Sequence, residues 1–418
     1  MNRALGLAFI ATLAATPALA EEPDGLVLPS GFHAQVVADG LTGARHLAVR
    51  DNGDIFVSTN HGRDQPSIGI YALRVGADRK AVQTEKFGAV DQGTGIRIWK
   101  GALYASSGTA VNKFALGDGL VPTAAPEVIV DGLVAASHPL AFDGRGNLFV
   151  STSGGGGTAN CPDPNAPKDA KPVGLKPCPL LATRGGVWRY DENKSGQKAA
   201  EGEHWATGIR NTSALDWRSG DTLYSAMHGR DGTSKGWPDF VSEADDDAIA
   251  DELTRLPKGA DQGWPYTYWD GAKGKRLVAP EYGGDGKKEP SESYAKPVAA
   301  FQPQRPAVLD LVFYNGRQFP AKYRGGAFIA MHGGGSDGTV LPGGHGGYNI
   351  TFVPFTGNGR AGKPVVFADN FAGPSAGDRN VKSAKYRPVG VAVGPDGSLY
   401  VVESQKGRLW RIYYGNNP

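Results

Sequence analysis

This chain of 418 residues has few cysteines, almost no excess of one sign of charge over the other, and no long apolar run. With 44 basic and 42 acidic side chains, it has no strong field of one sign to attract nucleic acid or an anionic membrane. Its apolar stretch at residues 4–15 is shorter than the roughly 20 residues that a membrane-spanning helix needs. These absences leave a small, neutral partner as the expectation.

The first twenty residues have the order of a secretory signal peptide. Asn2 and Arg3 precede the apolar stretch, and an Ala-Leu-Ala motif at 18–20 forms a small-residue cleavage site before Glu21. We therefore expect a secreted protein, with the bacterial periplasm as its compartment and a mature chain that starts near Glu21.

The two cysteines, Cys161 and Cys178, lie in a proline-rich stretch. Because disulfides persist in exported proteins, we expect these cysteines to be bonded to each other. Closing so short a loop stabilises a fold by about 3 kcal/mol in the chain-entropy model. Metal ligation is the alternative, but no neighbouring His or Cys completes a ligand set.

Long helical periodicities are also missing, whereas the 61 glycines direct attention to repeats. One pattern recurs: an apolar strand, a polar turn with glycine, and a second strand with alternating outward and inward residues. Its six copies occupy residues 46–57, 95–105, 138–150, 214–224, 311–330 and 389–401. A third strand follows several copies, at residues 69–74, 185–190 and 407–412.

Each repeat is a small sheet that cannot bury both of its faces alone. Radial stacking of six such sheets buries the faces and protects the edges. The sequence therefore predicts an all-β, six-bladed β-propeller, with residues 21–418 as one domain; a β-sandwich is the alternative. The stretches 151–184, 227–306 and 333–347 are rich in Gly, Pro and charge, and we expect long loops there that wall a pocket over the central channel.

Polar residues suited to chemistry lie at the entries and exits of the predicted strands. They are His138, Arg210, Asn211, His228, Asp231, His332, His345, Lys385 and Arg387. His138 is a candidate general base, because a neutral imidazole suits that role; a histidine hydrogen-bonded at a strand start is the alternative. The planar fork of Arg210 matches a carboxylate or quinone oxygen, with a surface arginine as the alternative. The acidic run 245–252 fits calcium or an exposed loop.

Six short motifs together resemble the soluble quinoprotein glucose and sorbosone dehydrogenases, which include aldose sugar and pyranose dehydrogenases. They read LPSGFH at 28–33, GIRN at 208–211, HGRD at 228–231, DELTRL at 251–256, GADQGWP at 259–265 and RPVGV at 387–391. Each motif is weak alone, but their order within six propeller repeats is specific. The resemblance implies pyrroloquinoline quinone over the axis, calcium (Ca²⁺) beside it, and oxidation of a sugar or polyol aldehyde by hydride transfer.

The resemblance also implies roles for individual residues. His138 matches the general base, and Arg210 matches a residue that polarises the quinone. The cofactor-binding residues that it implies are Gln92, Arg210, Asn211, Arg305, Lys385 and Arg387. The implied metal site comprises the backbone carbonyls of Gly229 and Arg230, assisted by Asp231.

The electrons must then pass to an external acceptor, a cytochrome or a quinone, because the chain has no Cys-x-x-Cys-His haem motif. Two other functions remain open at this point. A gluconolactonase-like, metal-dependent hydrolase would need carboxylate and Asn ligands on the axis, and the Arg- and His-rich set argues against it. A non-catalytic propeller that binds protein or glycan is the other, because a fold does not determine a function.

Overall fold

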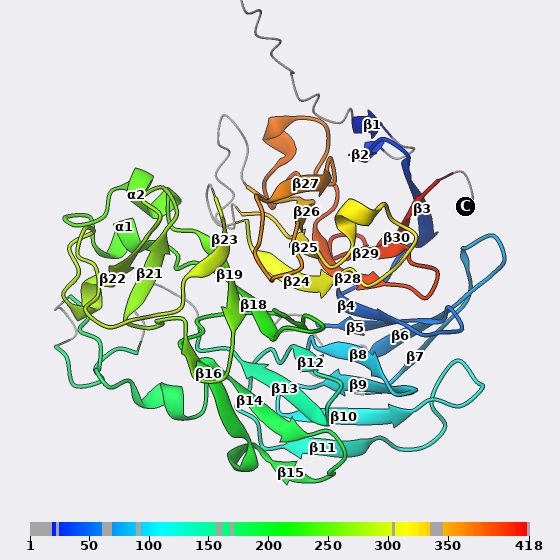
Figure 1. The fold of residues 1–418 in the computed structure, drawn as a ribbon, viewed down its shortest axis with the longest axis horizontal. Helices are drawn as coiled ribbons and strands as arrows, with labels where there is room; N and C mark the ends of the chain where they lie inside the picture. Colours follow the sequence, from blue (N-terminus) through cyan, green and yellow to red (C-terminus); the bar gives the residue numbers. More distant parts are fainter. Residues whose placement is uncertain are drawn as a thin grey trace, which may run out of the picture.

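Six small, mainly antiparallel sheets surround a central axis in the computed structural model of this protein (Figure 1). The structure describes residues 19–21, 25–60, 69–88, 93–155, 161–167, 171–302, 306–334 and 346–415. Strands dominate these ranges, which contain only two short α-helices, α1 (Thr233–Gly236) and α2 (Glu243–Asp247). The prediction of an all-β, six-bladed β-propeller is confirmed.

Each predicted repeat forms the two innermost strands of one blade. From the first blade to the sixth, the inner strands are β4 (Ala44–Val49), β8 (Ile96–Trp99), β12 (Leu140–Phe142), β17 (Ala214–Trp217), β24 (Val308–Phe313) and β28 (Pro388–Val393). The second strands are β5 (Ile55–Thr59), β9 (Ala102–Ser106), β13 (Asn147–Thr152), β18 (Leu223–Met227), β25 (Ala327–Met331) and β29 (Leu399–Glu403). Because each pair is antiparallel, inner strands start and second strands end at the same end of the axis.

Outer strands complete the blades and close the ring. They are β6 (Ile70–Val75), β7 (Ala81–Phe87), β10 (Ala110–Ala115), β11 (Glu127–Asp131), β14 (Gly186–Asp191), β16 (Glu203–Thr207), β19 (Asp251–Leu256), β23 (Pro297–Phe301), β26 (Asn349–Val353), β27 (Val365–Ala368) and β30 (Leu409–Tyr414). The short strands β15 (Gln197–Lys198) and β20 (Ala260–Asp261) extend the second and third blades. In the sixth blade, β3 (Phe32–Ala38) from the N-terminal part of the chain pairs with β30 from the C-terminal part. Backbone hydrogen bonds between the two strands therefore close the ring.

Residues 1–18 of the predicted signal peptide lie outside the described residues. Residues 19–21 form β1 (Leu19–Glu21), which pairs with β2 (Val27–Pro29). The described ranges contain no helix long and apolar enough to cross a membrane. Short 3-10 helices lie in the connections between strands: η2 (Pro179–Ala182), η3 (Ala199–Glu201), η4 (Pro280–Tyr282), η5 (Ala321–Tyr323) and η6 (Ala376–Asp378).

The hydrophobic core lies between the blades. Phe32 on the closing strand β3 packs edge-on against Phe319, with ring centroids 4.8 Å apart, and against Phe367 at 4.9 Å. Burying one such ring contributes about 2–3 kcal/mol. Near the axis the packing is backbone on backbone: a Cβ at Gly390 would lie 2.4 Å from the carbonyl oxygen of Arg45. Glycine therefore allows the sixth blade to approach the first.

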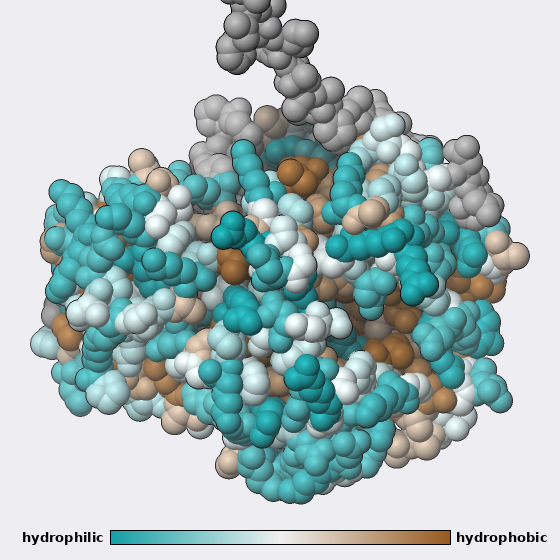
Figure 2. Space-filling model, in the orientation of Figure 1, coloured by the Kyte–Doolittle hydropathy of each residue, from teal (hydrophilic) through white to brown (hydrophobic). Residues whose placement is uncertain are grey.

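The expectation of an uninterrupted loop at residues 227–306 is wrong. This stretch supplies β19 and β23 of the fourth blade, together with the hairpin β21 (Thr267–Asp270) and β22 (Lys275–Val278). Its polar sequence hid β19, where Asp251 and Glu252 are buried with hydrogen-bond partners. The hairpin lies with α1 and α2 beside the propeller (Figure 1), and we call residues 232–250 and 262–296, on either side of β19 and β20, the insert. Hydrophilic side chains cover most of the insert on the face shown in Figure 2.

Candidate functional site

Four basic side chains from four blades converge at the end of the axis where the inner strands start. Arg45 lies in β4, His228 follows β18, His332 follows β25 and Arg387 directly precedes β28. Burial, with the charges of Arg387 and Arg45 and the nearby His228, holds the pKa of His332 well below its ordinary value. We call these four residues the axial cationic cluster, after its two arginine cations.

The two arginines of this cluster have no carboxylate within ion-pair distance in the described part of the chain. Arg387 donates from Nε to the carbonyl of His332 (3.2 Å) and from Nη2 to that of Gly333 (2.9 Å). The Nε of Arg45 is buried without a hydrogen-bond partner among the described residues. Burial and the charge of Arg387 lower the pKa of Arg45. Two partly buried cations without a counter-ion form a site that favours an anion such as a carboxylate.

A β-bulge determines the position of Arg45. The register of β4 against β5 shifts between Ala44 and Leu47, so Arg45 lies within the irregular segment. Bulges next to functional sites re-aim side chains in this way. Sequence reasoning missed Arg45, because the bulge leaves no mark on the strand pattern; its place directly before the first repeat was the available signal.

The buried carboxylate of Glu403 holds the backbone around Arg387. Its Oε2 accepts hydrogen bonds from the N–H groups of Arg387 (3.2 Å) and Gln405 (2.7 Å). Its Oε1 accepts from those of Lys406 (2.8 Å) and Arg408 (2.9 Å). Four donors on one carboxylate fix the turn after β29 against the entry to β28. Sequence reasoning also missed this residue.

Arg210 binds the loop predicted to hold calcium. Its Nη1 donates to the carbonyl of Gly229 (2.7 Å), and its Nη2 lies 2.8 Å from Oδ2 of Asp231. The neighbouring Asn211 donates from its amide to Nδ1 of His228 (3.4 Å). Arg210 is buried, so this loop and the start of the fourth blade form one hydrogen-bonded unit.

The side chain of Arg230 points into the insert. Both of its Nη atoms bind the buried carboxylate of Glu281, at 3.0 and 2.9 Å. The carbonyl of Glu281 accepts from the N–H of Gly174, in the loop closed by the disulfide between Cys161 and Cys178. These contacts connect the disulfide loop, the insert and the 229–231 loop in series.

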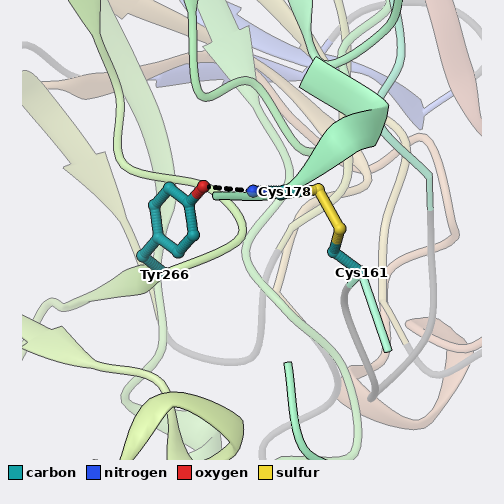
Figure 3. The surroundings of a disulfide bond; sticks show 3 residues. All are labelled: Cys161, Cys178 and Tyr266. Carbon is teal, nitrogen blue, oxygen red and sulfur yellow. Dashed lines mark hydrogen bonds between the residues drawn. A yellow bond between two sulfur atoms is a disulfide. The ribbon is translucent and has the colours of Figure 1, made fainter. Parts of the chain in front are cut away.

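The disulfide loop has a second attachment to the insert. The backbone N–H of Cys178 donates to the hydroxyl oxygen of Tyr266 at 2.7 Å, beside the bond to Cys161 (Figure 3). The two sulfurs are buried. Gly174 and Cys178 therefore attach the described part of the disulfide loop to the insert at two places.

His138 is fully buried at the start of the third blade. Its Nδ1 lies 2.9 Å from the carbonyl oxygen of Ser151, and its Nε2 lies 3.0 Å from that of Gly108. Burial lowers the pKa of His138, and these carbonyl contacts oppose the shift. A neutral imidazole carries one ring proton, so it can donate to only one of the two carbonyls.

The structure separates Lys385 from Arg387. Lys385 is exposed, and its ammonium lies over the ring of Tyr386, 5.0 Å from the centroid. Gln92, Arg305 and His345 lie outside the described residues.

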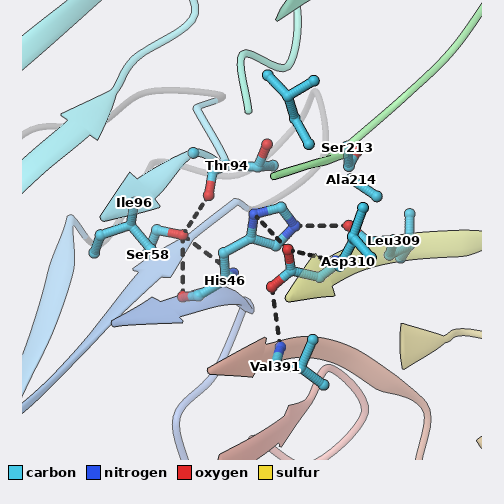
Figure 4. A network of polar contacts seen from close by, with 12 residues as sticks. His46, Ser58, Thr94, Ile96, Ser213, Ala214, Leu309, Asp310 and Val391 are labelled. Carbon is cyan, nitrogen blue, oxygen red and sulfur yellow. Dashed lines mark hydrogen bonds and ion pairs between the residues drawn. The ribbon is translucent and has the colours of Figure 1, made fainter. Parts of the chain in front are cut away.

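A second polar network joins the inner strands of the blades around His46 and Asp310 (Figure 4). Asp310 of β24 accepts from the N–H of Val391 (3.0 Å) and lies 3.9 Å from Nδ1 of His46. Arg97 lies 3.7 Å from the same carboxylate and donates to the carbonyl of Leu215 (3.0 Å). The network therefore connects the first, second, fourth, fifth and sixth blades.

No group of three or more His, Cys, Asp or Glu side chains in the described ranges is placed to hold a metal ion. The donors predicted for calcium, the Gly229 carbonyl and the Asp231 carboxylate, both bind Arg210 here. A cation at this loop would share these oxygens with Arg210 or displace it, so the fit to calcium is incomplete.

Fold and site together define a six-bladed propeller with an anion-accepting site on its axis. The sequence model of the TrAA12-like family matches residues 26–415, and the chain belongs to this family. A curated relative, an uncharacterized protein of Borreliella burgdorferi, is 24% identical over 220 residues. That match covers 52% of this chain and 50% of the relative, so the chain spans about half the length of the relative it matches.

Solved structures share the fold over nearly the whole chain. The holo form of the pyranose dehydrogenase PQQ domain from Coprinopsis cinerea has a TM-score of 0.69 at 16% identity, covering 93% of this chain and 97% of that one. The calcium structure of a Trichoderma reesei family AA12 carbohydrate-active enzyme has a TM-score of 0.69 at 18% identity, with coverages of 97% and 99%. At these identities the likeness establishes the fold alone.

Proposed function

We propose that this chain oxidises a sugar of aldose, pyranose or sorbosone type by hydride transfer to pyrroloquinoline quinone. The observation that carries the proposal is the pair of Arg45 and Arg387, two partly buried guanidinium groups with no carboxylate partner in the described chain. Pyrroloquinoline quinone is a polycarboxylate, and guanidinium forks suit its carboxylates. Family membership and a structural neighbour described as a PQQ domain support this choice.

The residues of the chain would bind the cofactor, orient the sugar and remove its hydroxyl proton. When bound, pyrroloquinoline quinone supplies the electrophilic carbonyl that takes up the hydride. Arg45 and Arg387 would hold its carboxylates. Asn211, whose amide bonds to His228, would offer its remaining hydrogen-bonding capacity to the sugar.

Two imidazoles are candidates for the general base. The resemblance to quinoprotein dehydrogenases favours His138, but both nitrogens of His138 face backbone carbonyls. His332 bonds through Nε2 to the hydroxyl of Ser404 (2.8 Å), and its Nδ1 has no hydrogen-bond partner among the described residues. Since a base must present a lone pair to the substrate, the geometry favours His332.

The external acceptor, calcium and the periplasmic location belong to the same proposal. Calcium would use the carbonyls of Gly229 and Arg230 with Asp231, and its binding would require Arg210 to share or give up its contacts with Gly229 and Asp231. We expect exhaustive chelation to release cofactor if calcium is bound there. Unchanged cofactor absorbance after chelation would remove calcium from the site and leave the arginine pair as the cofactor anchor.

The deciding experiment is titration of the purified chain with pyrroloquinoline quinone, followed by a dye-reduction assay with a panel of aldoses. We expect binding by the wild type and a loss of affinity of at least about 100-fold in Arg45→Gln/Arg387→Gln, because each charge-assisted contact contributes about 1.5–3 kcal/mol. Arg74→Gln, at a half-buried arginine of the first blade that pairs with Asp54, is the matched control. Absence of cofactor binding, or lactone hydrolysis without dye reduction, would refute the proposal.

A further inference from the structure

A group of basic side chains lies on the sixth blade beside the axial cationic cluster. The cationic groups of Lys385, Lys406 and Arg408 lie over the ring of Tyr386, at 5.0, 5.3 and 5.2 Å from its centroid. Lys382 is exposed in the neighbouring turn, which Gln405 contacts through the carbonyl of Val381. We call Lys382, Lys385, Lys406 and Arg408 the basic rim.

Carboxylates nearby neutralise the basic rim only in part. Arg408 pairs with Asp39 at 2.5 Å, but Lys382, Lys385 and Lys406 have no ion-pair partner in the described chain. Glu403 is close in sequence but buried, with its oxygens bonded to four backbone N–H groups. The shared ring attracts each cation by only about 0.5–1 kcal/mol at exposed sites. The basic rim therefore keeps excess positive charge on a chain whose net charge is only +2.

The basic rim is continuous with the candidate site. Ser404, in the same turn as Lys406, bonds to Nε2 of His332 through its hydroxyl (2.8 Å). Its backbone N–H donates to the carbonyl of Arg387 (3.1 Å). One side of this turn thus contacts the axial cationic cluster while the other carries Lys406 into solvent. A protein that covered the basic rim would lie beside the site.

We propose that the basic rim is the docking surface for an acidic protein that accepts electrons. This inference rests on the proposed function, because the reduced cofactor must lose its electrons to a partner. Each sugar oxidation releases two electrons and two protons; two ferric cytochrome molecules each take one electron, and the protons go to water. Complementary charge accelerates such encounters and makes them dependent on salt.

The test compares an acidic and a basic c-type cytochrome as oxidants of the cofactor-loaded protein. Lys382→Glu/Lys406→Glu reverses charge on the basic rim without changing the axial cationic cluster. The matched control is Lys322→Glu, an exposed lysine whose ammonium lies 5.1 Å from the centroid of Tyr323, in the connection between β24 and β25 at the other end of the axis.

We expect the acidic cytochrome to be reduced faster than the basic one, with a rate that falls as ionic strength rises. The double variant should lose at least about 10-fold of that rate at low salt, in line with the gain that steering supplies. Dye reduction should stay unchanged, and Lys322→Glu should match the wild type. Equal rates for both cytochromes, or an equal loss in the control variant, would overturn the proposal.

Binding of the oxidised acidic cytochrome at low ionic strength, measured by biolayer interferometry, separates the two proposals. An absence of dye reduction in the wild type would be a failure of the proposed function. Weaker cytochrome binding by Lys382→Glu/Lys406→Glu than by Lys322→Glu would still support the docking surface. Equal binding by the two variants would refute it.

Discussion

At the scale of single residues, the surroundings of each histidine determine what its ring can do. His228 receives a hydrogen bond from Asn211 on Nδ1, so its proton is on Nε2, which faces the carbonyl of Val308 at 2.6 Å. His332 is kept neutral by burial and by the nearby charges of Arg387 and Arg45. A neutral ring with one nitrogen available can accept a proton.

Substitution of the two candidate bases distinguishes their roles. We expect His332→Ala to lower kcat by at least about 10²-fold, the range for loss of a general base, while cofactor still binds. His138→Ala should lower Tm and leave turnover per folded molecule nearly intact, because its contacts are with buried backbone. Single-turnover reduction, bound cofactor and Tm measured on one preparation check this. The reverse pattern would assign the base to His138.

Glu403 is expected to position Arg387 without touching a ligand. Glu403→Gln replaces one carboxylate oxygen by an NH2 group, which cannot accept hydrogen bonds from the backbone N–H groups that face it. The turn after β29 and Arg387 should therefore shift. We expect the Kd for the cofactor to rise about 10-fold, with a lower Tm.

Glu192→Gln is the control for Glu403→Gln, because Glu192 is equally buried but bonds Trp99 and Lys100 in the second blade. It should lower Tm alone. An unchanged Kd in a folded Glu403→Gln protein would contradict the positioning role.

At the scale of elements, the insert and the disulfide loop support the site from outside. The insert supplies Glu281, which holds Arg230, and Tyr266, which holds Cys178. The disulfide joins cysteines that are 17 positions apart, so it closes a short loop. The site loop at 229–231 therefore depends on elements of the fourth blade and of the third-blade connection.

Removal of the disulfide should be costly. We expect Cys161→Ser/Cys178→Ser to lower the free energy of unfolding by about 3 kcal/mol, from loop-closure entropy. Tyr266→Phe, which removes a single hydrogen bond at the same place, should cost about 1 kcal/mol. Urea denaturation of both variants provides the comparison, and equal stability of the wild type and the double serine variant would contradict it.

At the scale of the whole molecule, the ring of blades is held together along its axis and at the sixth blade, where the ring closes. Asp310 and Arg97 connect inner strands of five blades, and β3 joins the sixth blade to the start of the chain. Beyond this network the axis opens into a cavity of about 530 Å³ lined by Arg97, Asp216 and aromatic rings. Asp216 there accepts a hydrogen bond from the N–H of Phe313 (2.8 Å), which ties the fourth blade to the fifth.

Asp216 should make the stability of the propeller depend on pH. Burial raises its pKa to about 6, with the charge of Arg97 opposing the shift. The pKa of Asp216 in the folded state exceeds the unfolded value of about 3.9, so the folded state holds this proton more tightly. The resulting contribution to the free energy of unfolding is complete below pH 4 and is lost as pH rises through about 6.

In the wild type, Asp216 should lower the free energy of unfolding by about 3 kcal/mol as pH rises from 4 to 7. Asp216→Asn should abolish this decrease. Urea denaturation across this range measures the slope for the variant and the wild type. The control is Asp51→Asn, at an exposed carboxylate, which should keep the wild-type slope. Identical slopes for Asp216→Asn and the wild type would show that Asp216 is ionised in the folded state.

The sequence by itself determined the blades, because the alternation of inward and outward residues along a strand and the glycine in a turn are local patterns. Such patterns involve only residues that are neighbours in the chain. All six repeats became inner strand pairs at their predicted places, from β4–β5 to β28–β29. The family also followed from short local motifs. By contrast, β19 was hidden because its Asp251 and Glu252 are charged residues that become buried only through partners elsewhere in the chain.

Only the tertiary structure decided which side chains meet on the axis. Arg45 reaches it through a bulge, and Arg387 bonds the carbonyl of His332, which is 55 positions away. His228 likewise bonds Val308, 80 positions away. Side-chain direction depends on such bulges and on contacts between distant segments, neither of which leaves a periodic signal. The sequence therefore indicated which residues lie at the ends of strands, and the packing of blades selected those that form the site.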